Sequence, residues 1–236
     1  MKNAIGKNPA SPVGLFRLRN GFTLVEVLIV IGVLAVLAAL LIPTLGRARS
    51  MARNVECRNN LRQWSVALIT YSKDCGGYIP RRGQGERELR KIDRDSDWFN
   101  CLPPYVEELP YRELAEQDRL PRAGDKSIFI CPVATQTDSD YFLPYAMNRF
   151  LSSWDRPDPH HITEVIEQSK VVFLADAPGP FSSTGISDKP WCVTARHDGE
   201  ANLLFLDGHT ESFTAEYLGC GSDDPHRPDV RWDFSE

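Results

Sequence analysis

The stretch "GFTLVEVLIVIGVLAVLAALLIP", residues 21–43, decides how this chain is organised. One acidic side chain, Glu26, stands near its start, and no other charged residue follows before Arg47. A helix through the uncharged residues 27–46 would be about 30 Å long, which is the thickness of the hydrocarbon core of a bilayer. The remainder of the chain is polar. We therefore predict a single membrane-spanning helix that anchors a soluble domain, and not a multi-span transporter.

The segments on both sides of this stretch are basic. Residues 1–20 contain four basic side chains and no acidic one, which is typical of a segment that stays in the cytoplasm. Five arginines against one glutamate follow in residues 47–62, so the positive-inside rule alone does not decide the orientation. An ordinary signal peptide would have a shorter apolar core, of about 7–15 residues. The net charge of −5 gives no indication of nucleic-acid binding.

Residues 21–43 resemble the N-terminal cleavage and methylation segment of type IV prepilins and type II secretion pseudopilins. The resemblance implies that prepilin peptidase removes a leader by cutting after Gly21. Phe22 would become the N-methylated terminus, and Pro43 stands where these helices usually carry a kink. Glu26 would pair with the terminal amine of a neighbouring subunit, an attraction that is strong in a low-dielectric environment. A glutamate that reaches from a plain membrane anchor to the lipid headgroups is the alternative.

Several later segments resemble a large bacterial family of prepilin-like proteins with a C-terminal His-x9-Asp-Gly signature. In this chain the signature is His197, nine residues, and then Asp207-Gly208, within "RHDGEANLLFLDGH". The other similar segments are "CRNNLRQWSVALITYSKDCGGYIP", "CP", "YAMN" and "VVFLADA", at residues 57–80, 131–132, 145–148 and 171–177. This resemblance implies an architecture more directly than it implies a function.

The hydrophobic pattern extends the N-terminal helix beyond the membrane. Apolar residues recur at helical spacing from Cys57 to Tyr71, and Gly76-Gly77 favours the end of the helix. The C-terminal part shows strand-length apolar runs and two Asp-Gly pairs, which favour tight hairpin turns. We expect a β-meander near residues 170–213, with its last strands at 191–196, 201–206 and 209–213. The predicted fold class is α+β and pilin-like, with a long N-terminal helix packed on an antiparallel sheet.

This pattern predicts four regions along the chain: a leader (1–21), a transmembrane and assembly helix (22–46), its amphipathic continuation (47–77) and an extracytoplasmic head (78–236). Residues 81–130 are charged and interrupted by prolines. We expect irregular structure there on the surface of the head, with a short helix at residues 110–120.

The histidines and aspartates do not predict a catalytic centre. A tight turn at Asp198-Gly199 would place Asp207 about 20 Å from His197 along the next strand. We therefore expect these two residues to support opposite ends of the sheet. The adjacent pair His160-His161 is expected in a solvated turn.

No enzyme and no transition metal are expected. The chain has no Gly-x-Ser-x-Gly and no His-Glu-x-x-His motif. Asp176, at the end of a buried strand, would orient a loop or bind calcium, with Asp223 and Asp224 as further calcium candidates. A calcium site is thus the one cofactor that the sequence suggests, and no EF-hand spacing supports it.

Six cysteines lie in the part of the chain predicted to be outside the cytoplasm, where disulfides are stable. We favour a pair between Cys57, on the apolar stripe, and Cys131, whose Cys-Pro segment occurs in the resembling family. Buried free thiols are the alternative. A zinc site is not expected, because the chain has no closely spaced Cys-x2-Cys pair.

Together these patterns predict a structural subunit of a type IV pilus or a type II secretion pseudopilus, and do not separate the two. Its partners would be prepilin peptidase, other pilin or pseudopilin subunits and the inner membrane, with the head in the periplasm or outside the cell. One alternative is a membrane-anchored binding module that does not polymerise and binds its ligand on the His-x9-Asp-Gly sheet. A periplasmic metal hydrolase is a third hypothesis.

Overall fold

The computed structural model describes residues 23–83, 92–135, 141–152, 160–179, 183–184, 193–219 and 227–233. The predicted cleavage site at Gly21-Phe22 lies outside these residues, as do Asp223 and Asp224. The chain forms two compact units, Met1–Gly46 and Arg47–Glu236.

The N-terminal helix α1 (Leu24–Asp74) is continuous over 51 residues. It begins with a capping box between Thr23 and Glu26. The Thr23 hydroxyl accepts a hydrogen bond from the Glu26 N–H at 3.2 Å. In return, the Glu26 carboxylate accepts from the Thr23 N–H at 2.8 Å and from the Thr23 hydroxyl at 2.9 Å. The Thr-x-x-Glu spacing thus defines where the helix starts.

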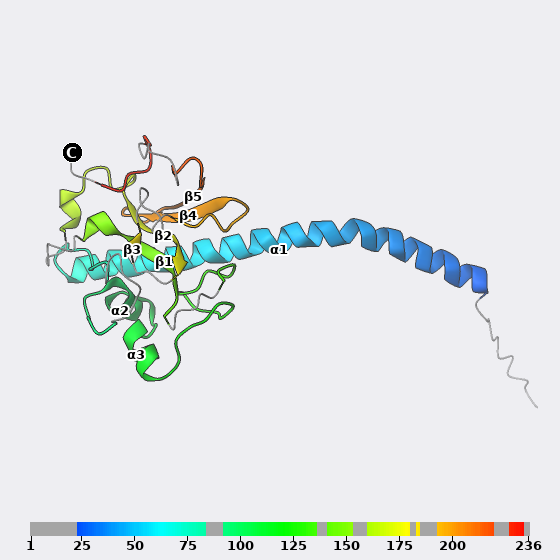
Figure 1. The fold of residues 1–236 in the computed structure, drawn as a ribbon, viewed down its shortest axis with the longest axis horizontal. Coiled ribbons are helices and arrows are strands. Elements are labelled where there is room, and N and C mark those ends of the chain that lie inside the picture. Colours follow the sequence, from blue (N-terminus) through cyan, green and yellow to red (C-terminus); the bar gives the residue numbers. More distant parts are fainter. Residues whose placement is uncertain are drawn as a thin grey trace, which may run out of the picture. The chain divides into compact units, whose positions relative to one another are not determined.

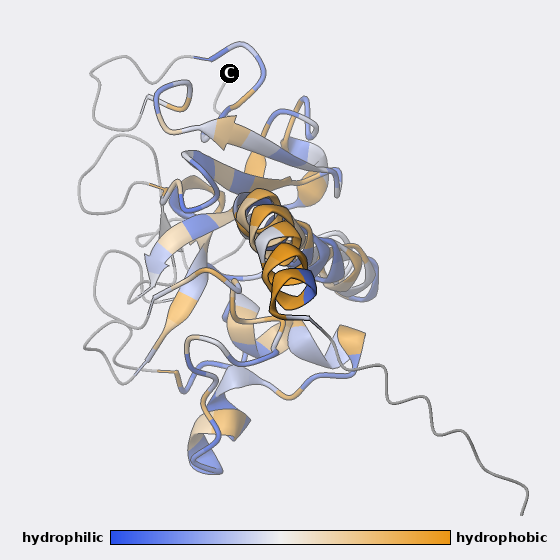
Figure 2. Cartoon of the chain, turned by 90° about the vertical axis from the view of Figure 1, so that its right-hand side faces the viewer, coloured by the Kyte–Doolittle hydropathy of each residue, from blue (hydrophilic) through white to orange (hydrophobic). Residues whose placement is uncertain are grey.

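The first part of α1, residues 24–46, is coloured as hydrophobic along most of its length (Figure 2), and its large apolar side chains are exposed. Among the described residues it is the one helix whose length and composition would allow it to cross a membrane. Pro43 lies inside this helix, where it lacks the N–H that an interior position normally donates. This part of α1 is suited to a lipid environment or to contact with other apolar helices.

The second part of α1, residues 47–74, packs against the head and shares its core. Cys57, Leu61, Trp64 and Leu68 are all fully buried, as the apolar stripe predicts, and Tyr71 is partly buried. The helix ends at Asp74, and the N–H of Gly77 donates to the carbonyl of Ser72 at 2.7 Å. Gly76 and Gly77 both have positive φ, so these glycines supply the predicted C-terminal cap.

One sheet packs on this part of α1, in the order β3-β1-β2-β4-β5. Four of its strands are antiparallel, and the short β3 is parallel to β1. The α+β, pilin-like layout is therefore confirmed. The strands are β1 (Leu143–Asn148), β2 (Val172–Gly179), β3 (Ser183–Thr184), β4 (Glu200–Phe205) and β5 (Thr210–Thr214).

The prediction of a strand at residues 191–196 is wrong for residues 193–196, which form no strand. Residues 191–192 lie outside the described residues. Its expected place beside β4 is taken by β2, for example through the pair Leu174 and Leu204. Seven of the eight residues of β2 are buried, so this strand belongs in the middle of the sheet and pairs on both sides.

The two Asp-Gly turns differ from each other. Asp198 and Gly199 both have positive φ, and the flanking His197 and Glu200 exchange two backbone hydrogen bonds of 3.0 Å. This is the predicted two-residue hairpin turn. At the second turn only Gly208 has positive φ, and the N–H of Phe205 donates to the carbonyl of His209. Three residues, 206–208, therefore lie between the hydrogen-bonded pair Phe205 and His209 at the turn from β4 to β5.

Residues 92–130 are largely irregular, as expected, but they are not confined to the surface. They supply buried aromatic rings, and Trp98 and Phe129 pack edge-to-face on Trp64 with ring centroids at 5.1 and 5.3 Å. The second part of α1 therefore lies between this segment and the sheet (Figure 1). The short helices are α2 (Trp98–Cys101), η1 (Pro103–Val106), α3 (Tyr111–Glu116), η2 (Arg149–Leu151) and η3 (Ile162–Glu164).

The loop between β4 and β5 rests directly on α1. A Cβ added at Gly208 would lie 2.6 Å from the Ser65 Oγ and 3.1 Å from the Ile69 Cδ1. Because real Cβ contacts are longer than this, only a glycine fits at this point without displacing a neighbour. The glycine of the His-x9-Asp-Gly signature is thus a close contact between sheet and helix.

We predict that Gly208→Ala destabilises the head more than Gly124→Ala. Both glycines have nearly the same φ, +94° and +93°, but an added Cβ at Gly124 meets nothing within 4 Å. The shared backbone strain costs about 1–2 kcal/mol, and the clash at Gly208 adds about 1–3 kcal/mol. Thermal unfolding of the two variants measures the difference. Ser65→Ala removes the nearest atom and should reduce the cost of Gly208→Ala; equal costs in both backgrounds would contradict the contact.

Candidate functional site

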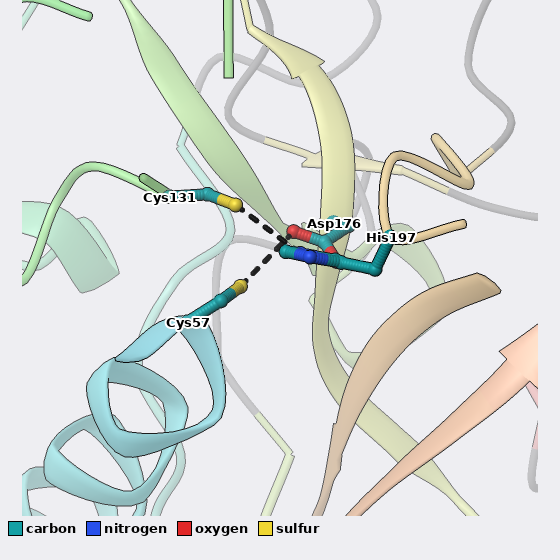
Figure 3. A group of neighbouring side chains, drawn as sticks. All are labelled: Cys57, Cys131, Asp176 and His197. Atoms are coloured by element: carbon teal, nitrogen blue, oxygen red, sulfur yellow. Dashed lines mark hydrogen bonds and ion pairs between the residues drawn. The ribbon is translucent and has the colours of Figure 1, made fainter. Parts of the chain in front are cut away.

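Four buried side chains from four separate segments meet beside α1 (Figure 3). They are Cys57 from α1, Cys131 from the segment before β1, Asp176 from β2, and His197 from the turn that leads into β4. The first three are fully buried and His197 is 4% exposed. One donor atom from each lies within 4.8 Å of every other, so the group could hold a metal ion.

Local structure fixes each of these side chains. Cys57 lies on the buried face of α1, and the segment that carries Cys131 is held to the same face by side-chain hydrogen bonds. Asn60 Nδ2 donates to the carbonyl of Ile130 at 2.8 Å, and Trp64 Nε1 donates to that of Ile128 at 2.9 Å. His197 is oriented by the tight turn at Asp198-Gly199. The site therefore depends on the core and not on an exposed loop.

The His197 ring nitrogen Nε2 points into the middle of the group. It lies 3.3 Å from the Cys131 sulfur and 3.4 Å from the Asp176 Oδ2. The Cys57 thiol donates to the Asp176 Oδ1 at 3.6 Å. The carboxylate of Asp176 thus presents one oxygen to a thiol and the other to the imidazole.

Further groups surround these four. The Tyr145 hydroxyl donates to the Cys57 sulfur at 3.2 Å, and the N–H of Asn202 donates to the Asp176 Oδ2 at 2.8 Å. The Arg196 Nε lies 3.9 Å from the Asp176 Oδ1. These contacts position the sulfur and the carboxylate and place one positive charge beside them.

The electrostatics of the group favour a thiolate on Cys131. The neighbouring Cys57 thiol and the contact with His197 lower the pKa of Cys131 to about 6, against the effect of burial. Burial opposes the charged form of His197, but its contacts with Asp176 and Cys131 raise its pKa to about 9. Burial also raises the pKa of Cys57. Both pKa shifts are in the direction that favours the charged forms, a thiolate on Cys131 and an imidazolium on His197.

The predicted pair Cys57 and Cys131 is brought together, but the structure contains both as free cysteines. The lack of a Cys-x2-Cys pair does not exclude zinc in this fold, because the fold brings four donors from distant positions together. One feature of the sequence does point to these four residues. Each of the four residues lies in a segment that carries the second resemblance.

The structure places His197 and Asp207 at opposite ends of β4. Asp207 accepts hydrogen bonds from the N–H of His209 and lies 2.6 Å from its Nδ1, on the loop whose Gly208 contacts Ser65. Cys57 and Ser65 are eight residues apart on α1, or about 12 Å along the helix axis. The signature thus brings the β4 hairpin to α1 at two points.

The pair His160-His161 is not in a simple solvated turn. The His161 Nε2 lies 2.9 Å from the carbonyl oxygen of Gly76, and its ring packs edge-to-face on Tyr78. A Cβ at Gly77 would lie 2.1 Å from this ring nitrogen. His161 therefore covers the C-terminus of α1, while His160 pairs with Glu164 at 3.0 Å.

The surroundings of Asp176 do not fit calcium. Calcium binds six to eight oxygen atoms, whereas the neighbours that Asp176 meets in the described part of the chain include two thiols and an imidazole. The other two calcium candidates, Asp223 and Asp224, lie outside the described residues.

Residues 16–42 match the family model of the prokaryotic N-terminal methylation motif. The chain is a prepilin-like protein. More specifically, this motif supports a type IV pilin-like or pseudopilin-like protein. The match includes Gly21, Phe22 and Glu26.

A second family model, described as "Protein of unknown function (DUF1559)", matches residues 46–157 of the prepilin-like protein. This range contains Cys57 and Cys131 and ends before Asp176 and the His-x9-Asp-Gly signature. No curated protein and no solved structure matches the chain.

We predict that Asp176→Asn destabilises the head by about 3–5 kcal/mol, because it removes one charge from a buried, paired group. Asp207→Asn is the matched control. Asp207 also lies beside a histidine, but it is 37% exposed, so its substitution should change stability by no more than about 0.5 kcal/mol. Urea unfolding of the detergent-solubilised chain measures both. Equal stability of the two variants would show that the buried group does not hold the head together.

Proposed function

We propose that this prepilin-like protein is a structural subunit that assembles into a type IV pilus or a type II secretion pseudopilus. Prepilin peptidase would cut after Gly21 and methylate the new terminus at Phe22. The match of residues 16–42 to the methylation motif carries this proposal. No enzymatic role is proposed for the head.

The apolar surface of α1 supports assembly through this helix. Large apolar side chains between Leu24 and Leu45 are exposed on every face of the helix. Lipid would cover them before assembly, and helices of neighbouring subunits would cover them in a fibre. Burial of apolar surface contributes about 25 cal/mol per Å², so helix packing would supply much of the free energy that holds a fibre together.

Glu26 is proposed to pair with the N-methylated amine of a neighbouring subunit. Its carboxylate already accepts two hydrogen bonds from Thr23. A carboxylate has about four lone-pair positions, so the helix cap leaves acceptor sites for an amine. The capping box would also hold the carboxylate in one place while the neighbouring subunit docks.

The proposed topology places the leader in the cytoplasm, one helix in the inner membrane and the head outside. The partners are prepilin peptidase and other pilin or pseudopilin subunits, and no nucleic acid. The alternative of an anchored binding module has less support. Its expected ligand surface includes His197, which is buried, and Gly208, which packs on α1.

Intact-mass analysis of the protein from its native membrane tests the processing step. We expect loss of residues 1–21 and the addition of one methyl group on Phe22. An uncut chain in a cell with active prepilin peptidase would overturn the proposal and favour the anchored binding module.

Substitutions at Thr23 and Glu26 test assembly, because they separate the charge of Glu26 from its role as a helix cap. Glu26→Gln keeps a residue that suits the capping box but removes the charge. Thr23→Ala removes the hydroxyl of the cap but keeps the charge. We expect Glu26→Gln to abolish fibre formation and Thr23→Ala to preserve it.

The measurement is the fraction of the protein recovered in sheared fibres, at equal amounts of processed protein in the membrane. Intact mass of each variant confirms that its leader has been removed. Normal assembly of Glu26→Gln would contradict the pairing with the neighbouring amine. Loss of assembly in Thr23→Ala alone would show that assembly requires the helix cap and not the charge of Glu26.

A further inference from the structure

We propose that Cys57, Cys131, Asp176 and His197 bind one structural Zn²⁺ ion, which joins the head to α1. Zinc binding at this group goes beyond the function proposed above, and it does not depend on polymerisation. The inference rests on donor geometry, donor chemistry and local charge.

The separations of the His197 Nε2 from its two neighbouring donors are close to the edges of a zinc tetrahedron. With typical bond lengths of about 2.3 Å to sulfur and about 2.0–2.1 Å to nitrogen or oxygen, the edges are about 3.5 Å for S–N, about 3.4 Å for N–O and about 3.6 Å for S–O. Two of the corresponding separations here are 3.3 Å (Cys131 Sγ to His197 Nε2) and 3.4 Å (His197 Nε2 to Asp176 Oδ2), while the Cys57 Sγ lies 3.6 Å from the other carboxylate oxygen, Oδ1. One donor atom from each residue lies within 4.8 Å of every other. The four donors are therefore close enough together for small shifts of their side chains to place them around one small ion.

The donor types favour zinc over harder cations. Two thiolates with an imidazole and a carboxylate suit a borderline-soft ion in tetrahedral geometry, whereas calcium and magnesium require oxygen. Two thiolates and one carboxylate carry three negative charges, of which Zn²⁺ balances two. The Arg196 guanidinium, whose Nε lies 3.9 Å from Asp176, balances the third. The bound site would thus be neutral, as a buried site requires.

The surrounding contacts indicate a structural site and not a catalytic one. The protein supplies all four donors and buries them, so no coordination position is left for water or substrate. Tyr145 donates to the Cys57 sulfur and the N–H of Asn202 donates to Asp176. Such contacts orient ligands around a metal.

A disulfide between Cys57 and Cys131 is the competing state. Its formation would release two protons and two electrons to an oxidant. In the disulfide, Cys57 would have no thiol proton to donate to the buried Asp176. Cys131 would have no thiolate charge to interact with the buried His197. Zinc instead uses all four side chains. It would also connect four segments that are far apart in the sequence, which a single disulfide does not do.

The test uses the full chain, purified in detergent without a histidine tag or chelators and analysed for metals by mass spectrometry. We expect about one zinc per chain in the wild type and in Cys75→Ser, whose cysteine is free and exposed. Cys57→Ser and His197→Ala should lose nearly all of it. A chelator should lower the melting temperature of the wild type and of Cys75→Ser.

A second measurement does not depend on whether these variants fold. Metal-free wild-type protein is titrated with Co²⁺, which should give sulfur-to-cobalt charge-transfer absorption that saturates at about one ion per chain. Peptide mapping under non-reducing conditions, with free thiols blocked, then reports on Cys57 and Cys131. A stoichiometric disulfide between them, or Co²⁺ binding without the sulfur band, would overturn the proposal.

Discussion

The burial of one face of α1 is the constraint on which the head depends. Residues 57–68 of this helix pack against the sheet on one side and against the aromatic rings of residues 92–130 on the other. Trp64 makes two kinds of contact with residues 92–130. Its ring packs on Trp98 and Phe129, and its indole N–H holds the backbone of Ile128. Without these apolar side chains of α1, neither the sheet nor residues 92–130 could bury their own apolar side chains.

Much of the fold follows from local patterns in the sequence. The apolar run, the helical stripe from Cys57 onward and the paired glycines after Asp74 together predict α1 nearly to its ends. The turn at Asp198-Gly199 is also predictable, because two consecutive positive φ angles favour that dipeptide. In each case the information lies within a few neighbouring residues.

The features that were not predicted depend on contacts between distant residues. No local pattern shows that β2 pairs with β4, or that residues 92–130 carry their aromatic rings inward. The candidate metal site is the clearest case. Its four donors come from four different segments, and the packing of α1 against the sheet and against the segment that carries Cys131 brings them to one point. Matches of short segments to a family mark such residues without showing that they meet.

The His-x9-Asp-Gly signature fixes the distance between two points at which the β4 hairpin contacts α1. His197 reaches α1 at Cys57 through the buried cluster, and Gly208 reaches it again at Ser65. The strand between these points advances by a fixed rise per residue, and so does the helix beneath it. Adding one residue to β4 would shift Gly208 off Ser65 and turn the following side chains to the opposite face. Insertions should therefore be tolerated in loops outside this hairpin. The nine residues between His197 and Asp207 should keep their number in any chain that keeps both contacts.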